Sequence, residues 1–387
     1  MESRLFRAAK SRLREISFLR RMVNGRGGRR TDEDYVEMSN KCKAGSIEPD
    51  RHKERLVRKW QPRRHLSKTE EARIALVCME TWESRSLIPP ILSSRESVHI
   101  PIIDTTDYDE YLKQQSFVLR EFLGADRISP FDLVLVYATN AQLSSETLSR
   151  ISERGPLVAL MCLDDKHSFE ERHPVRGWPA GQVPLIGSVH VHLTNSRECV
   201  RWYDCADACA LHWPEGANPD FGYLCDVQKD IAVSFVGQKY GQRIEYVNNL
   251  RKQGINVTCF GRGWENPFVS DVEMFRVFAR SKINLGFGYV GVSKEITCLK
   301  ARDFDVTGSG NFYMTTYDAE LAECFDIGRE IACYRNEIEC AELIRYYLDN
   351  DQLRYLVAEA GRKRVLREHL WQHRLDSLMR WAGMVKP

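Results

Sequence analysis

The sequence predicts an α/β protein with two doubly wound domains in tandem, each a parallel sheet with helices on both faces. Two observations predict this fold. Short apolar runs alternate with helix-length segments, and the alternation restarts after Asn218-Pro219. Alternating strands and helices are typical of parallel sheets, and 387 residues leave room for two domains and an extension.

The strands of the first domain are predicted from continuous apolar runs, because a parallel strand covered on both faces needs no polar alternation. Helix-length segments such as 108–123 and 144–154 separate these runs, and a short helix is expected near 51–60. The runs are 73–78, 98–103, 131–137, 156–163 and 189–193.

The second domain repeats the alternation and ends in long helices. Strands are expected at 231–236, 255–260, 282–287, 311–314 and 330–334. Helices are expected at 242–253, 272–280, 337–349, 351–368 and 369–384. This pattern predicts a basic helical extension and linker, a first domain, a second domain and a C-terminal helix that packs back on the first domain, over residues 1–70, 71–225, 226–368 and 369–387.

Positive charge is concentrated at the N-terminus. Residues 1–30 hold ten Arg or Lys and two acids, a charge of +8, which leaves −6 for the rest of a chain whose total is +2. Apolar residues recur at helical spacing over 1–24, so a basic amphipathic helix is expected. Such a helix could lie on an anionic membrane surface, pack on its own protein or contact nucleic acid.

The cellular compartment is predicted from what the sequence lacks. It has no apolar stretch long enough to span a membrane and no secretory leader, so we expect a cytoplasmic protein. The 12 cysteines include no Cys-x-x-Cys pair, and several lie within apolar strand-like runs. We therefore expect reduced thiols that pack as small hydrophobes.

Two glycine-containing segments follow predicted strands of the second domain. In 235–243, Gly237 could let backbone N–H groups approach a phosphate, and Arg243 could clamp a diphosphate. In 260–264, Gly261 could flank a nucleotide base on which Trp264 stacks. Each segment could equally be a plain turn with a surface Arg or a buried Trp.

A third segment, 286–291, has the G-x-G-x-x-G spacing of dinucleotide-binding proteins, and Asp303 and Asp305 follow at about the expected distance. We do not adopt this interpretation, because those acids do not end a clear second strand and the match occurs late in the chain.

The densest cluster of candidate groups lies in 300–315. Lys300 and Arg302 could neutralise a leaving diphosphate, and Asp305 could accept hydrogen bonds from sugar hydroxyls. A glycine turn at Gly310 leads to Tyr313 on the next strand. Each residue alone could be a solvated charge or part of an ordinary turn, but together they favour a phosphate and sugar site.

Carboxylates of the first domain are the candidates for acid–base work. Asp165, in a pair with Asp164 after a buried strand, could act as a base on an acceptor hydroxyl, or could cap a helix. Glu215, in the hinge 213–219, could face the same cleft or belong to a rigid linker. No third ligand for a metal accompanies the Asp pair, so we expect no metal site.

Between residues 125 and 380 the chain resembles the CgeB-like glycosyltransferases, named for a spore-maturation protein. The resemblance rests on ordered motifs, which are Phe235-Val-Gly237 with Arg243, Gly261-x-Gly263-Trp264, 281–285, Arg302-x-Phe304-Asp305, Gly308-x-Gly310, Glu330-Ile331, 346–348, Ala360-Gly361 and His369. It implies the GT-B fold, in which two Rossmann-like domains face a central cleft. It also implies a nucleotide-sugar donor, expected to be a UDP-sugar, bound in the second domain, with no obligatory metal and no cofactor.

The sequence departs from the family pattern at the donor side. Related retaining enzymes carry two glutamates there, whereas the corresponding positions here are Asp305 and Tyr313. This absence leaves open a non-catalytic protein that binds sugar nucleotides or glycans. A glycosyltransferase acting on nucleic-acid bases also remains open, because nothing in the sequence names the acceptor.

Overall fold

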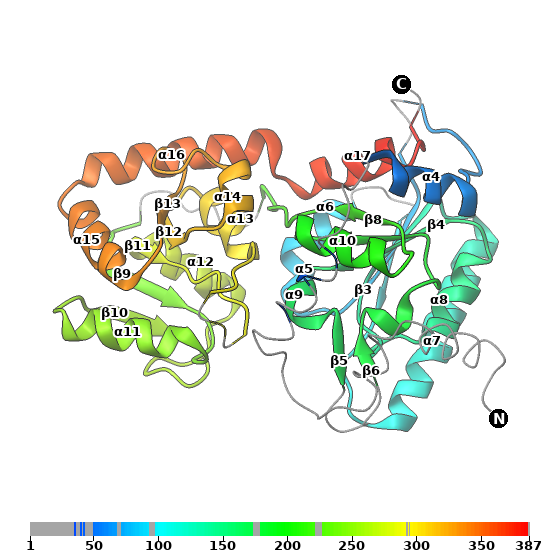
Figure 1. Cartoon of the computed structure of the whole chain (residues 1–387), viewed down its shortest axis with the longest axis horizontal. Coiled ribbons are helices and arrows are strands. Elements are labelled where there is room, and N and C mark those ends of the chain that lie inside the picture. Colours follow the sequence, from blue (N-terminus) through cyan, green and yellow to red (C-terminus); the bar gives the residue numbers. More distant parts are fainter. Residues whose placement is uncertain are drawn as a thin grey trace.

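The computed structural model describes residues 35, 39–40, 42, 49–67, 71–92, 97–172, 179–220, 227–291, 293 and 295–385. The helix expected over residues 1–24 and most of the expected linker lie outside these residues. Two α/β units lie side by side (Figure 1), each built on a parallel sheet. The predicted fold class is therefore confirmed.

The first unit contains a six-stranded sheet in the order β2-β1-β3-β4-β7-β8, with every neighbouring pair parallel. The side chains of β1 and β4 are buried along their whole length, as expected for strands covered on both faces. The bounds are β1 Ile74–Cys78, β2 Val98–Pro101, β3 Leu133–Tyr137, β4 Leu157–Cys162, β7 Val191–Thr194 and β8 Ala210–His212.

Helices cover both faces of this sheet (Figure 1). The longer ones are α4 Pro49–Lys59, α7 Tyr108–Ile128, α8 Ser145–Ser152 and α10 Arg197–Cys205. Shorter elements follow the strands, namely α5 Glu83–Ser86, α6 Ile88–Ile91, α9 Asp165–Ser168, the 3-10 turn η1 Val183–Leu185 and the antiparallel pair β5 Glu170–Arg172 and β6 Pro179–Gly181. Asp107 and Ser144 cap α7 and α8 with their side chains, which explains where these helices begin.

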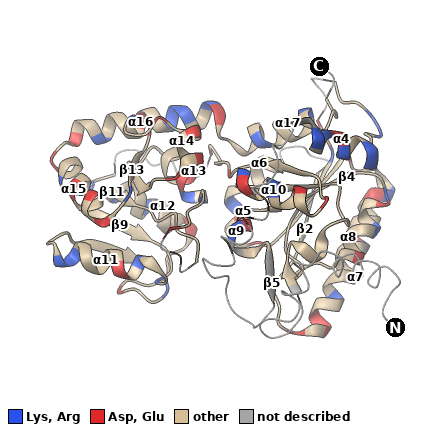
Figure 2. Cartoon of the chain, viewed as in Figure 1, with Lys and Arg blue, Asp and Glu red and all other residues tan. Residues whose placement is uncertain are grey.

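The second unit contains a five-stranded parallel sheet in the order β10-β9-β11-β12-β13. Its strands are β9 Ile231–Val236, β10 Val257–Phe260, β11 Ser281–Leu285, β12 Tyr313–Thr316 and β13 Ala332–Tyr334. Its helices are α11 Gln242–Lys252, α12 Asp271–Arg280, α13 Ala301–Gly308, α14 Ala319–Cys324, α15 Glu337–Leu348 and α16 Asp351–Glu368. Lys282 is the single Lys, Arg, Asp or Glu in the strands of the two large sheets, and the other charges of the described residues lie on helices, on loops and in the short strand β5 (Figure 2).

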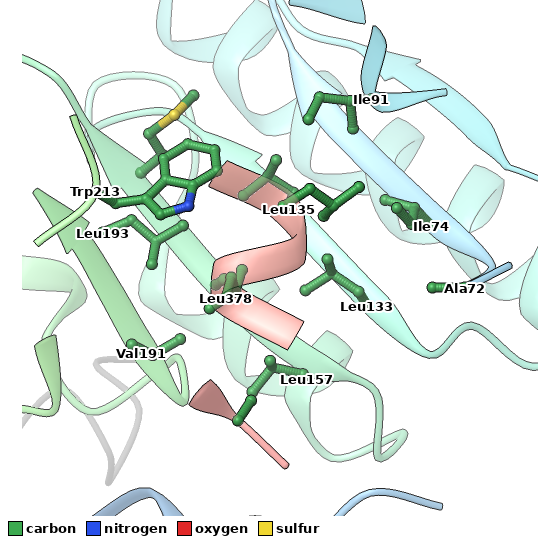
Figure 3. Packing of buried hydrophobic residues seen from close by; sticks show 14 of the residues in the cluster. Ala72, Ile74, Ile91, Leu133, Leu135, Leu157, Val191, Leu193, Trp213 and Leu378 are labelled. Atoms are coloured by element: carbon green, nitrogen blue, oxygen red, sulfur yellow. The ribbon is translucent and has the colours of Figure 1, made fainter. Parts of the chain in front are cut away.

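The last helix, α17 Trp371–Trp381, packs on the first unit although it follows the second in sequence. Figure 3 shows Leu378 of this helix among the same group of core side chains as Leu133 and Leu135 of β3, within the largest apolar cluster of the first sheet. Where the chain returns, Ala217 and the segment 369–371 exchange backbone hydrogen bonds of 2.9 and 3.2 Å. The segment that leads from the first unit to the second is therefore hydrogen-bonded to the segment that leads back.

The strands that the sequence predicts are all present, with ends shifted by a few residues. The sequence reasoning missed the short elements α10, β8 and α14, and it predicted no helix over 301–308, where the structure has α13. The expected domain boundary near residue 225 falls in 221–226, outside the described residues. Cys78, Cys162 and Cys259, expected to pack as small hydrophobes, are buried and free.

Candidate active site

The topology of the second sheet determines where a ligand site can form. Its strand order reverses between β9 and β11, because β9 and β10 pair on one side while the chain continues on the other. Loops after strands diverge at such a switch point, which leaves a place for a ligand at the carboxyl ends of the strands. Gly237 follows β9 and Gly286 follows β11, so both lie at this edge of the sheet.

The glycine after β10 is required by the contact between the loops that follow β9 and β10. Gly261 has a φ of 130°, and a Cβ at this position would lie 2.4 Å from the carbonyl oxygen of Gly237. The N–H of Gly237 donates to the carbonyl of Phe260 at 2.8 Å. The N–H of Gly310 likewise donates to the carbonyl of Thr307 at 3.0 Å, so both of these N–H groups have partners within the protein.

Arg243 and Arg302 form a cationic pair beside the switch point. Arg243 stands in the first turn of α11, its guanidinium 4.2 Å from the ring centroid of Tyr240 and in a 3.2 Å hydrogen bond to the carbonyl of Gln238. Burial lowers the pKa of Arg243, and the charge of Arg302 lowers it further. Among the described residues, neither Arg makes an ion pair with a carboxylate, and Nε of Arg302 is buried without a hydrogen-bond partner.

Lys300 adds a third cation and joins the two domains. It precedes α13, where its N–H donates to Asp303 at 2.7 Å, and its Nζ lies 3.3 Å from Oδ1 of Asp164 in the first domain. The side chain of Asp164 is 55% exposed. The first turn of α13 therefore presents Lys300 and Arg302 toward the boundary between the domains, at the positively polarised end of a helix.

Asp305 also faces the first domain. It is half-buried on α13, and its Oδ1 accepts a 3.3 Å hydrogen bond from Ser86 of α5. Burial raises the pKa of Asp305 to about 7, against the opposing effects of Ser86 and Arg302. The carboxyl of Asp305 is therefore partly protonated near neutral pH. It lies at the boundary between the domains, where a ligand could reach it.

Tyr313 is buried, and its contact with Gly286 accounts for the first glycine of the motif at 286–291. A Cβ on Gly286 would lie 2.1 Å from the hydroxyl of Tyr313, so the close approach of the two strands excludes a side chain there. The carbonyl of Gly286 accepts a 2.6 Å hydrogen bond from Tyr334. Packing between β11, β12 and β13 accounts for this glycine, and no dinucleotide is needed to explain it.

Trp264 lies in the core of the second domain. Only 9% of the residue is exposed, and its ring is in edge contact with Phe235 at 6.1 Å between centroids. Nζ of Lys239 lies 5.1 Å from the centroid of the indole ring. The indole is not an open platform on which a nucleotide base could stack, so the direct stacking role expected from the sequence does not fit this position.

Asp165 is also placed differently from the expectation. Its side chain is fully buried, its Oδ1 accepts a 2.8 Å hydrogen bond from Tyr203, and burial raises its pKa to about 6. Asp165 therefore holds α9 against α10 and does not face an acceptor. Its neighbour Asp164 carries the exposed carboxylate, which lies at the domain boundary beside Lys300.

Glu215 lies at the hinge and is 2% exposed. Burial raises its pKa to about 8, so the carboxyl is mostly protonated at neutral pH. Its Oε1 accepts a 3.1 Å hydrogen bond from Asn195, whose amide also donates to the carbonyls of Leu163 and Leu299. Glu215 thus belongs to a buried hydrogen-bond network, centred on Asn195, that connects the two domains.

Other ligand types are constrained by two further observations. Within the described residues, no group of three or more His, Cys, Asp or Glu is placed to hold a metal ion. In the same part of the chain, no helix is long and apolar enough to cross a bilayer.

The second domain resembles a known protein family. Residues 243–380 match the model of a family described as glycosyl transferase-like. A search of curated proteins finds no significant match.

Solved structures share the architecture of about four fifths of the chain. Sucrose-phosphate synthase from Thermosynechococcus elongatus is 10% identical over 80% of this chain and 98% of its own, with a TM-score of 0.51. HepE from Anabaena, solved with UDP, is 7% identical over 80% and 98%, with a TM-score of 0.53. A glycosyltransferase from Rickettsia africae is 9% identical over 81% and 99%, with a TM-score of 0.53.

At these identities the structural likeness shows the fold, which is GT-B. Together with the family match over residues 243–380, this fold supports glycosyltransferase as the class of enzyme. The similarity to the glycosyl transferase-like family lies in residues 243–380.

Proposed function

We propose that the protein transfers a sugar from a nucleoside-diphosphate sugar, expected to be a UDP-sugar, to an acceptor hydroxyl. The observation that carries the proposal is the pair Arg243 and Arg302 at the switch point, two cations without a carboxylate partner among the described residues. A diphosphate supplies the negative charge that such a pair lacks. The UDP bound to HepE, which has the same fold, supports the choice of nucleotide.

The three cations of the second domain would act on the leaving group. As the bond between the anomeric carbon and the diphosphate oxygen breaks, its electron pair moves to the diphosphate. Arg243, Arg302 and Lys300 would stabilise the charge that grows there, which is where preorganised cations contribute most. Because these residues can supply the positive charge, we propose that transfer does not require a divalent metal. Asp305 would orient sugar hydroxyls.

The acceptor hydroxyl would attack the anomeric carbon and lose its proton. If the enzyme inverts the anomeric centre, we propose Asp164 as the base, because its carboxylate is exposed and lies opposite α13. Asp165 and Glu215, the bases expected from the sequence, are buried in hydrogen-bonded positions. Glu215 would instead maintain the buried hydrogen-bond network that connects the two domains.

The finer assignments are also proposals. We place the protein in the CgeB-like branch because of the ordered motifs in the second domain, and we propose a cytoplasmic location. Contact of residues 1–30 with a membrane surface would favour a membrane-proximal acceptor, and co-sedimentation with anionic vesicles, with and without these residues, tests that contact. Nucleic-acid binding by the same segment would instead show as salt-sensitive retention of DNA or RNA.

The experiment that tests the proposed function compares thermal stabilisation by UDP, GDP, dTDP, CDP, ADP and NAD, with and without EDTA. Selective stabilisation by one nucleoside diphosphate, unaffected by EDTA, is the expected result, and donor turnover with that nucleotide should follow. Binding without turnover of any donor sugar would favour the non-catalytic binding protein. A response to NAD alone would contradict the proposal.

A further inference from the structure

Helix α10 of the first domain begins without a cap from its own chain segment. Ser196 has the extended backbone of an N-cap residue, yet its side chain accepts no hydrogen bond from the first turn. The first N–H groups of a helix lack partners within the helix, and they favour an anionic group. The start of α10 therefore needs an acceptor from elsewhere.

That acceptor is Glu320 of helix α14, in the second domain. The hydroxyl of Ser196 donates to its Oε1 at 2.8 Å. The N–H of Arg197, the first residue of α10, lies 3.1 and 3.0 Å from Oε1 and Oε2. One carboxylate from the second domain thus takes the capping position of a helix in the first.

A third group of the first domain completes the surroundings of this carboxylate. Nε2 of His212, in β8, lies 3.0 Å from Oε2 of Glu320, and both side chains are only 16% exposed. These contacts lower the pKa of Glu320 although burial alone would raise it. Hydrogen bonds to a partly buried charged group are stronger than neutral ones, because water competes less for the carboxylate.

We propose that Glu320 is a positioning residue that holds the second domain closed against the first, by capping α10 across the domain boundary. Its partners, Ser196, Arg197 and His212, are separate from Lys300, Arg302 and Asp164 at the candidate active site. Glu320 would therefore act on transfer through the population of the closed state and not through contact with the donor. The kinetic part of this inference rests on the proposed glycosyl transfer, whereas closure itself does not.

The chain offers a matched control three residues further along α14. Glu323 also reaches across the boundary, with one oxygen 2.8 Å from Nε of Arg197, but this pair is 54% and 59% exposed. Exposed pairs contribute little because solvent screens them and long side chains lose freedom. Glu323→Gln should therefore leave closure unchanged.

The test measures the shape of the full chain by small-angle X-ray scattering, without ligand, for wild type, Glu320→Ala, Glu320→Gln and Glu323→Gln. We expect a larger radius of gyration for Glu320→Ala, a smaller increase for Glu320→Gln, and wild-type scattering for Glu323→Gln. Circular dichroism checks that each variant remains folded, and Glu320→Gln keeps the shape of the side chain if alanine unfolds the protein.

Kinetics then separate positioning from donor binding. We expect Glu320→Ala to lower kcat/KM for the acceptor by about tenfold, because an open state must close before transfer, with the affinity for UDP within about twofold of wild type. Wild-type scattering by both Glu320 variants would overturn the proposal whatever the activity. If wild type transfers no sugar, the proposed function fails while the scattering result still decides the role of Glu320.

Discussion

Nζ of Lys300 lies 3.3 Å from Oδ1 of Asp164, and this contact joins the first turn of α13 to the end of β4 in the other domain. The carboxylate occupies a place beside a cation that the proposed function assigns to a diphosphate. Asp164 and the donor would therefore compete for Lys300 when the nucleotide binds.

Asp164→Asn tests this competition. Removing the charge frees Lys300, so we expect UDP to bind up to about fivefold more tightly, which is the upper range for a half-exposed ion pair. If Asp164 is also the base, kcat for transfer should fall at the same time. Isothermal titration with UDP and an initial-rate assay measure the two effects, with the exposed Glu153→Gln as control. Weaker UDP binding would show that Asp164 supports the donor site.

Arg302→Ala removes the guanidinium whose Nε is buried without a partner. We expect kcat/KM for the donor to fall at least about tenfold, which corresponds to about 1.4 kcal/mol of lost transition-state stabilisation. Arg276→Ala, at an exposed position of α12, should behave as wild type. Unchanged donor turnover by a folded Arg302→Ala protein would remove Arg302 from the site.

Gly261→Ala should destabilise the second domain. The φ of 130° is strained for alanine, and the new Cβ would meet the Gly237 carbonyl oxygen at 2.4 Å. We expect a loss of about 1–3 kcal/mol in the free energy of unfolding, measured by urea denaturation. Gly124→Ala, in helix α7 with open space around it, should instead stabilise by about 0.5–1 kcal/mol. Equal effects of the two substitutions would contradict the packing described between the loops.

Glu215→Gln should change how stability depends on pH. Burial raises the pKa of Glu215 to about 8, whereas the pKa of a glutamate in an unfolded chain is about 4.3. Between these values the folded protein holds a proton that the unfolded chain has released, so this carboxyl makes stability fall as pH rises. A glutamine resembles the protonated acid and does not titrate.

We therefore expect the stability of wild type to fall relative to Glu215→Gln from pH 5 to 8, by at most about 1.4 kcal/mol per pH unit. Urea denaturation at several pH values measures the difference, and Glu342→Gln on the exposed face of α15 is the control. Parallel pH profiles for wild type and Glu215→Gln would show that Glu215 is ionised in the folded protein.

Local pattern was enough to predict most strands of the two large sheets and most of the long helices. Apolar runs such as 157–162 and 231–236 coincide with β4 and β9, because a strand buried on both faces needs apolar side chains in succession. The ends of the predicted strands also drew attention to the glycines after β9 and β10. The cations Lys300 and Arg302 were noted from their spacing in 300–315. The role of each residue as a ligand-binding or catalytic group stays a prediction.

Local sequence patterns could not show which side chain of a motif faces the domain boundary. Asp164 and Asp165 are neighbours with the same chemistry, yet the turn into α9 exposes one and buries the other against Tyr203. Trp264 looked suited to stacking, but its ring packs under Lys239 and beside Phe235. Glu320 gave no signal, since its partners lie more than 100 residues away.

The sequence by itself thus determined the class of fold, the alternation of strands and helices and the loops that can approach a ligand. These features depend on periodicity and on backbone freedom at single positions, which short segments already contain. The tertiary structure alone decided which carboxylates are exposed and that Glu320 caps α10. Burial and contacts across a domain boundary depend on residues far apart in the chain, so no local pattern records them.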